Sequence, residues 1–155
     1  MIMVEFKNNL GQLHRDDGPA VDCNGHKWWY TNGQIHREGG LPAIECTSGT
    51  KMWYELGQLH RDGGLPAVEY ASGGKEWLVK GFRHRDGGLP AVERVNGYNK
   101  WYVNGELHRE GGLPAIECIN GDVVWFINGE ELSFETGLAY MAFCQKMQSS
   151  RRMHV

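Results

Sequence analysis

The sequence predicts a mainly β protein: an elongated antiparallel β-hairpin array of five repeats of about 24 residues, closed by a C-terminal α-helix. Three observations carry this prediction. A motif recurs at a fixed spacing, Gly-rich turn signals stand at fixed places within each period, and the spacing of apolar residues becomes helical after residue 132. Self-similarity with a period of 20–50 residues is the signature of stacked structural repeats.

The recurring motif is a His-Arg pair followed by an acid, glycine, proline and alanine. Its copies begin at His14, His36, His60, His84 and His108. The last four read His-Arg-acid-Gly-Gly-Leu-Pro-Ala and are 24 residues apart, whereas the first repeat is two residues shorter, lacking the Leu before Pro19 and one residue between Cys23 and Trp29. The deletions fall at turn signals, where loops tolerate them. We call the whole stretch, from the histidine to the alanine, the corner segment.

Tryptophans recur with the same period, at Trp29, Trp53, Trp77, Trp101 and Trp125. One repeat cannot bury such a face alone, so neighbouring repeats must stack to make a continuous core. We therefore predict that these five side chains form the structural core rather than a platform for a ligand.

Each repeat contains two strand signals and two turn signals. In the third repeat, residues 65–70 and 75–81 are short runs rich in β-branched and aromatic residues around a Gly-rich link, which is typical of a hairpin. If the hairpins close about Ser48 and Ser72, acids and lysines face each other across the strands, Glu45 opposite Lys51 and Glu69 opposite Lys75. The second turn is Asn-Gly at 32–33, 104–105 and 128–129, which favours a type I′ turn.

From Ser133 the pattern is helical. Ser133 is a suitable N-cap, and two apolar faces follow, one of Phe134, Leu138, Met141 and Ala142 and one of Tyr140, Phe143 and Met147. We expect three parts: residues 1–132 as the hairpin array with an N-terminal lead-in strand, 133–148 as a mostly covered capping helix, and 149–155 as a flexible tail. The length of 155 residues predicts one structural unit.

Composition excludes several classes of function. The net charge of −3 argues against general nucleic-acid binding, which needs clustered Lys and Arg. No apolar run is long enough for a membrane span, and the first residues do not read as a secretory signal. Cys23, Cys46 and Cys118 share one repeat position. Equivalent residues of successive hairpin repeats lie two strands apart, which is too far for a disulfide. Free thiols indicate a reducing compartment, and we expect a cytoplasmic protein.

The candidate binding row consists of the His-Arg pairs of the last four corner segments, which are His36, Arg37, His60, Arg61, His84, Arg85, His108 and Arg109. Arginine presents a planar donor fork suited to carboxylate or phosphate. Two interpretations stay open. The row recognises a partner, or it is structural, with each His capping a turn and each Arg paired with the adjoining acid.

Catalysis and metal binding are not expected. Histidines of successive repeats would lie about 10 Å apart, too far for two of them to bind one metal ion. The His-Arg-Asp triplets match the kinase catalytic loop only by accident, since no other kinase motif accompanies them. We predict no enzyme activity, no catalytic residue, no metal and no cofactor.

The run 101–112, Trp-Tyr-Val-Asn-Gly-Glu-Leu-His-Arg-Glu-Gly-Gly, resembles the MORN repeat in a variant form, and the resemblance covers residues 6–132. It implies an elongated hairpin array that mediates protein–protein contacts. The Leu-Pro-Ala segment and the fixed His-Arg pair look like a subgroup from tailed phages and large DNA viruses. That likeness implies a viral protein whose partner is a host or virion protein, met in the host cytoplasm.

The function we predict is a non-enzymatic scaffold that binds a partner macromolecule, a protein, through an extended face. One alternative is a binder of a small anionic ligand, phosphorylated or nucleotide-like, held by the His-Arg row. Another is a structural assembly module that self-associates through an exposed sheet edge.

Overall fold

The computed structural model describes residues 3–152 and shows a mainly β protein, with many short antiparallel strands and one C-terminal helix. These features confirm the predicted class. The chain divides into two compact units, Met1–Phe82 and Arg83–Val155, where its length predicted one. Hairpins that contact mainly their sequence neighbours build no central core, so length is a poor guide to the number of units.

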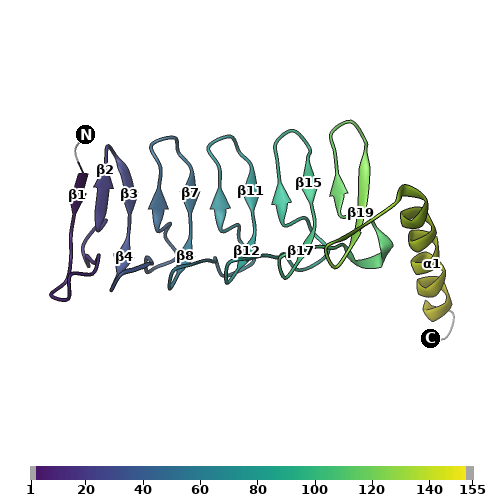
Figure 1. Ribbon diagram of the computed structural model, residues 1–155, viewed down its shortest axis with the longest axis horizontal. Coiled ribbons are helices and arrows are strands. Elements are labelled where there is room, and N and C mark those ends of the chain that lie inside the picture. The colour runs from purple at the N-terminus through teal and green to yellow at the C-terminus, as the bar shows by residue number, and fades with distance from the viewer. Residues whose placement is uncertain (1–2, 153–155) are drawn as a thin grey trace. The chain divides into compact units, whose positions relative to one another are not determined.

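The first unit is an antiparallel sheet whose strands follow the chain as adjacent hairpins (Figure 1). Its sheet order is β1 (Met3–Glu5), β2 (Val21–Cys23), β3 (His26–Trp28), β6 (Ile44–Glu45), β7 (Lys51–Met52), β10 (Val68–Glu69) and β11 (Lys75–Glu76). Between these strands the chain forms smaller hairpins, β4 (Tyr30–Thr31) with β5 (Gln34–Ile35) and β8 (Tyr54–Glu55) with β9 (Gln58–Leu59). The strand β12 (Leu78–Val79) is the last one wholly in this unit, and β13 (Phe82–Arg83) spans the boundary with the second unit.

The second unit continues the same plan. Its sheet order is β14 (Val92–Glu93), β15 (Asn99–Lys100), β18 (Ile116–Glu117), β19 (Val123–Ile127) and β20 (Glu130–Leu132), and β16 (Tyr102–Val103) pairs with β17 (Glu106–Leu107). A short 3₁₀ turn, η1 (Glu110–Gly112), precedes β18, and the helix α1 (Phe134–Arg152) follows β20. No helix in the described range 3–152 has the length and apolarity needed to cross a membrane.

The hairpin registers follow the prediction. Glu45 lies opposite Lys51, and Glu69 lies opposite Lys75. The Asn-Gly turns have positive φ at both residues, for example 48° at Asn32 and 81° at Gly33, as a type I′ turn requires. The strands are shorter than the sequence signals, because the run predicted for 75–81 is divided at Trp77 into β11 and β12.

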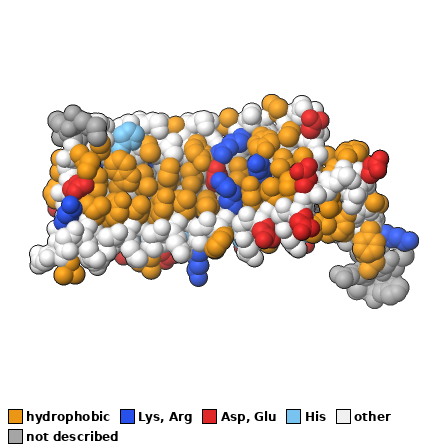
Figure 2. Space-filling model, in the orientation of Figure 1, with side chains coloured by type: hydrophobic (Ala, Val, Ile, Leu, Met, Phe, Trp, Pro, Cys, Tyr) orange, Lys and Arg blue, Asp and Glu red, His pale blue; other side chains and the backbone are white. Residues whose placement is uncertain are grey.

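The core is thin, and the tryptophan position supplies most of its bulk. Trp53, Trp77, Trp101 and Trp125 are buried, as predicted, whereas Trp29 is only half-buried. The alanine of every corner motif is fully buried beside them, at Ala20, Ala43, Ala67, Ala91 and Ala115. A second small cluster joins Ala67, Val68 and Leu78 in the first unit. Hydrophobic side chains reach the surface in a broad strip across the first unit (Figure 2), so much apolar area stays in contact with solvent.

The C-terminal helix is longer and less covered than predicted. The Ser133 hydroxyl accepts a hydrogen bond from the Thr136 N–H at 3.2 Å, the expected N-cap. The helix continues to Arg152, so the tail predicted from residue 149 is helical at its start, and residues 153–155 lie outside the described range. Its packed face is formed by Gly137, Tyr140, Met141 and Cys144, the buried and half-buried positions of the helix. Gly137 lies against Trp125 of β19, and Met141 and Cys144 lie against Gly112 of η1.

Neither predicted apolar face of the helix is the packed one. Phe134, Leu138, Phe143 and Met147 are exposed, and Met141 and Tyr140 come from different predicted faces. The physical reason is the glycine. A residue without a side chain allows the helix axis to approach the Trp125 ring closely, and apolar spacing alone gives no signal for such a contact.

Candidate functional site

The arginine of the third corner segment, Arg61, is held by three internal contacts. Arg61 lies over the Trp53 ring, with its guanidinium carbon 3.7 Å from the ring centre. Its Nη1 donates to the Pro66 carbonyl at 3.2 Å and to the Glu69 carboxylate at 2.8 Å. The guanidinium therefore covers the tryptophan on one side and ties the corner to the following strand.

The same arrangement recurs in other copies. Arg37 lies 3.7 Å above Trp29, and Arg109 lies 3.7 Å above Trp101. Arg37, Arg85 and Arg109 each donate to the proline carbonyl five residues on and to the glutamate eight residues on. The predicted pairing of each Arg with its adjoining acid is therefore wrong in these copies. A hairpin brings the distant glutamate back under the guanidinium, which local sequence does not reveal.

The adjoining acid pairs with the histidine instead. His60 Nε2 lies 3.0 Å from the Asp62 carboxylate, and His60 Nδ1 accepts the Lys80 backbone N–H at 3.4 Å. Because Nδ1 accepts, Nε2 is the atom that carries the hydrogen and donates to Asp62. Gly81 in the same turn donates to the Leu59 carbonyl, so the histidine helps to fix the next turn against its own hairpin. This is the turn-capping role that the structural interpretation predicts for His.

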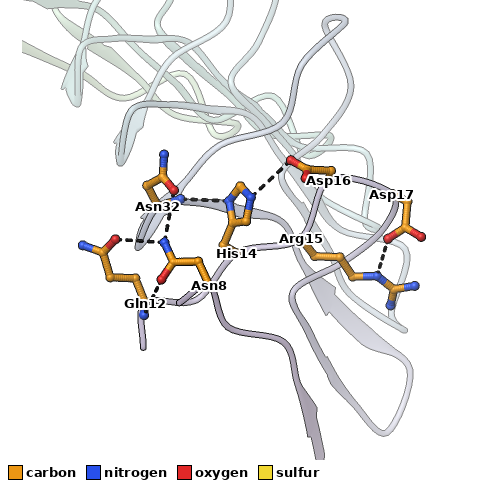
Figure 3. A network of polar contacts seen from close by, with 7 residues as sticks. All are labelled: Asn8, Gln12, His14, Arg15, Asp16, Asp17 and Asn32. Carbon is orange, nitrogen blue, oxygen red and sulfur yellow. Dashed lines mark hydrogen bonds and ion pairs between the residues drawn. The ribbon is translucent and has the colours of Figure 1, made fainter. Parts of the chain in front are cut away.

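The first corner differs in the partner of its arginine (Figure 3). His14 points to Asp16 and accepts the Asn32 N–H at 3.2 Å, while Arg15 turns away and binds Asp17 at 2.7 Å. This ion pair lowers the pKa of the Asp17 carboxyl, first through the hydrogen bond and then through the charge of Arg15. At this corner the arginine does bind an acid close to it in sequence.

Phe6 takes the place of a tryptophan at this first corner. The Arg15 guanidinium lies 4.0 Å from the Phe6 ring centre, and Phe6 donates its N–H to Ala20 just as Trp29 donates to Ala43. The 24-residue tryptophan spacing does not include Phe6, and sequence analysis missed it. The aromatic residue eight or nine positions before each His-Arg arginine was the available signal.

The groups that remain exposed on the corner segments are acids and leucines. The acid side chains are 81–98% exposed, and they are Asp16, Glu38, Asp62, Asp86 and Glu110. The leucine that follows the two glycines is 38–50% exposed, at Leu41, Leu65, Leu89 and Leu113. These leucines were not predicted as surface residues, and they are the second feature that sequence analysis missed.

An open groove lies between neighbouring corner segments in each unit. In the first unit, a groove of about 220 Å³ lies between His36 and His60, with Leu41, Tyr54 and Asp62 among its walls. In the second unit, a groove of about 190 Å³ lies between His84 and His108 in the same way. Burial raises the pKa of Tyr54, with a smaller contribution from Tyr30. That hydroxyl is therefore a neutral hydrogen-bonding group over the whole physiological range.

The predicted binding row is thus divided by the structure into two sets. Its arginines are engaged in the fold. Three of its histidines, His60, His84 and His108, bridge a turn and an acid, whereas His36 contacts Glu38 through Nε2 and its buried Nδ1 has no partner. Among the described residues, no three His, Cys, Asp or Glu side chains gather in a way that could hold a metal ion. The four cysteines are free thiols.

Comparisons of the chain with protein families, with curated proteins and with solved structures found no match. The MORN resemblance therefore stays a prediction.

Proposed function

We propose that the chain is a non-enzymatic scaffold, a five-repeat hairpin array of MORN type, that binds a partner protein through its corner segments. One observation carries the proposal: the later corners repeat an exposed carboxylate and an exposed leucine beside a groove. A single exposed leucine is ordinary on a protein surface. Within each unit, two corners present a leucine three residues after an exposed acid, which is the pattern expected of a surface that recognises a repeating partner.

The chemistry of these corners favours a basic partner. The exposed charged side chains are carboxylates, and the arginines that could balance them are bound to Glu45, Glu69, Glu93 and Glu117. A Lys or Arg of the partner would meet the acid, and an apolar side chain of the partner would enter the groove against leucine and tyrosine. Such a contact weakens with added salt, because the exposed carboxylates supply the attraction.

The alternative of a small anionic ligand has less support. A phosphate or carboxylate would have to displace a glutamate from an arginine that also stacks on tryptophan, for example Glu69 from Arg61. It would also approach through a rim of exposed acids. A partner with positive charge meets neither obstacle.

The experiment compares three purified forms of the full chain as bait in extracts of the cells where it acts. The corner variant carries Glu38→Gln, Asp62→Asn, Asp86→Asn and Glu110→Gln. The control variant carries the same change of charge at exposed glutamates elsewhere, Glu106→Gln, Glu130→Gln, Glu131→Gln and Glu135→Gln. Proteins captured by each form are identified by mass spectrometry, and the partner is then purified and its affinity measured at several salt concentrations.

The proposal predicts a basic partner that the wild type and the control retain and the corner variant loses. Its affinity for the wild type falls as salt rises. A partner that binds all three forms equally contradicts the proposal, because binding would then depend on another surface.

A further inference from the structure

The outer edge of β1 is an unpaired strand edge. β1 is the terminal strand of the first unit's sheet, and no strand of the described chain lies on its other side. Phe6 donates to the Ala20 carbonyl at 2.8 Å, and hydrogen-bonded positions alternate along an antiparallel pair. The backbone groups of Val4 therefore face β2, whereas the N–H and C=O groups of Met3 and Glu5 point outward. An edge of this kind is ready to pair with another strand.

The first repeat also lacks the neighbour that later repeats have. Trp53 donates its indole N–H to the Gly40 carbonyl of the preceding corner and is 6% exposed. Phe6 occupies the equivalent place, but no corner precedes it in the described part of the chain, and it is 38% exposed. Met3 and Val4 beside it are 53% and 43% exposed. The apolar end of the sheet and its open backbone groups thus lie together on one surface.

We propose that this surface binds a second copy of the chain, through an antiparallel β1–β1 pair with its two-fold axis at Val4. The edge is self-complementary in this register. The outward groups of Met3 in one copy meet those of Glu5 in the other, and the two Val4 side chains face each other across the axis. A pair of backbone hydrogen bonds forms on each side of the axis. These bonds use the outward groups of Met3 and Glu5, which have no strand of the described chain beside them in a single copy.

Charge selects this register over its neighbour. An axis at Glu5 would set the two Glu5 carboxylates directly opposite each other, and like charges at opposed positions destabilise a strand pair. An axis at Val4 sets each Glu5 opposite a methionine and leaves its ion pair with Lys7, at 2.9 Å, in place. A two-fold contact uses the edge once in each copy, so it closes as a dimer and does not grow into a filament.

The first test is the solution mass of the full chain, by light scattering or sedimentation over a range of concentrations. The wild type is expected to reach twice the monomer mass of 17.5 kDa. Met3→Glu sets like charges opposite each other on both sides of the axis and is expected to give a monomer. Met3→Lys sets opposite charges there and should lower the dissociation constant roughly three- to tenfold. The melting temperatures of the wild type and the two variants are compared at a concentration where all three are monomeric. Equal values show that β1 stays folded in the variants.

The second test is cross-linking. At the axis the two Val4 Cα atoms would lie about 4.5 Å apart, within the range of a disulfide. Val4→Cys is therefore expected to form a covalent dimer on mild oxidation, and the matched Glu5→Cys is not, since each Glu5 faces Met3 of the other copy. A wild type that stays monomeric at its highest soluble concentration overturns the proposal. So does a dimer that responds equally to Met3→Glu and Met3→Lys, or one that cross-links equally through both cysteine variants.

Discussion

Trp53 and Trp125 occupy the same place in their repeats but are covered by different groups. Both donate the indole N–H to a corner glycine, Gly40 at 2.8 Å and Gly112 at 3.1 Å, and they are 6% and 4% exposed. The ring of Trp53 lies under Arg61, as described above. The position of that arginine in the last repeat is Ser133, and there the helix α1 covers the ring.

The helix reaches Trp125 because of Gly137. A Cβ at this position would lie 2.4 Å from the indole, so the helix backbone itself rests on the ring, and Phe134 adds an edge-on contact at 5.6 Å. The two regions show that the fold needs the tryptophan ring covered and does not need a charge to do so. The arginine serves where another repeat follows, and the helix serves where the array ends.

Removal of the helix is expected to have the largest effect. Truncation after Leu132 leaves the Trp125 ring with neither an arginine nor a helix above it. We expect unfolding of the last hairpin or aggregation, measured by thermal melting and by the red shift of tryptophan fluorescence. A soluble truncated chain with unchanged melting would show that α1 is not a cap.

Loss of a middle tryptophan should come next. Trp53→Ala removes a buried aromatic and the contacts of Arg61 with it, and should lower the free energy of unfolding by about 3–5 kcal/mol. Trp28→Ala is the matched control, because Trp28 is half-buried and lies outside the tryptophan position. Chemical denaturation compares the two. Equal losses would mean that the tryptophan position has no special weight in the core.

Added bulk should affect stability differently on the packed face and on the exposed face of the helix. Gly137→Ala would normally favour a helix, by up to about 1 kcal/mol. Here the new Cβ meets the Trp125 ring, so we expect a loss of about 1–3 kcal/mol. Ala142→Leu on the exposed face is the control for added bulk and should change stability little. A stabilising Gly137→Ala would show that the helix does not rest on the ring.

Much of this fold could be predicted from the sequence, because its turns and its periodicity are local signals. The Asn-Gly turns, the hairpin registers, the buried tryptophans and the N-cap Ser133 all depend on residues close in sequence or one period apart. The partner of each arginine could not be predicted. Glu45 and Glu69 looked equally suited to Lys51 and Lys75 across the hairpin, and the choice depends on how the corner folds back over the sheet.

The ends of the chain were harder to predict than its middle for the same reason. Phe6 lies where the later repeats have a tryptophan. Gly137 allows the helix to cover Trp125, whereas an arginine covers the tryptophan in earlier repeats. Neither residue therefore belongs to a periodic pattern. Their roles follow only from the surface that the neighbouring repeat presents. The exposure of Leu41 and Leu65 is similar, since an apolar residue next to Pro-Ala reads as part of a buried strand.

The central claim is that the corner arginine holds the fold while the adjoining acid is left for recognition. The most direct test is chemical denaturation of Arg61→Ala and Asp62→Asn, adjacent changes in one corner. We predict that Arg61→Ala lowers the free energy of unfolding by about 1–2 kcal/mol, because it removes the cation–π contact and the bond to Glu69, discounted for partial exposure. Asp62→Asn, with its side chain 92% exposed, should change it by less than about 0.5 kcal/mol. Equal losses, or a larger loss for Asp62→Asn, would contradict this division of roles.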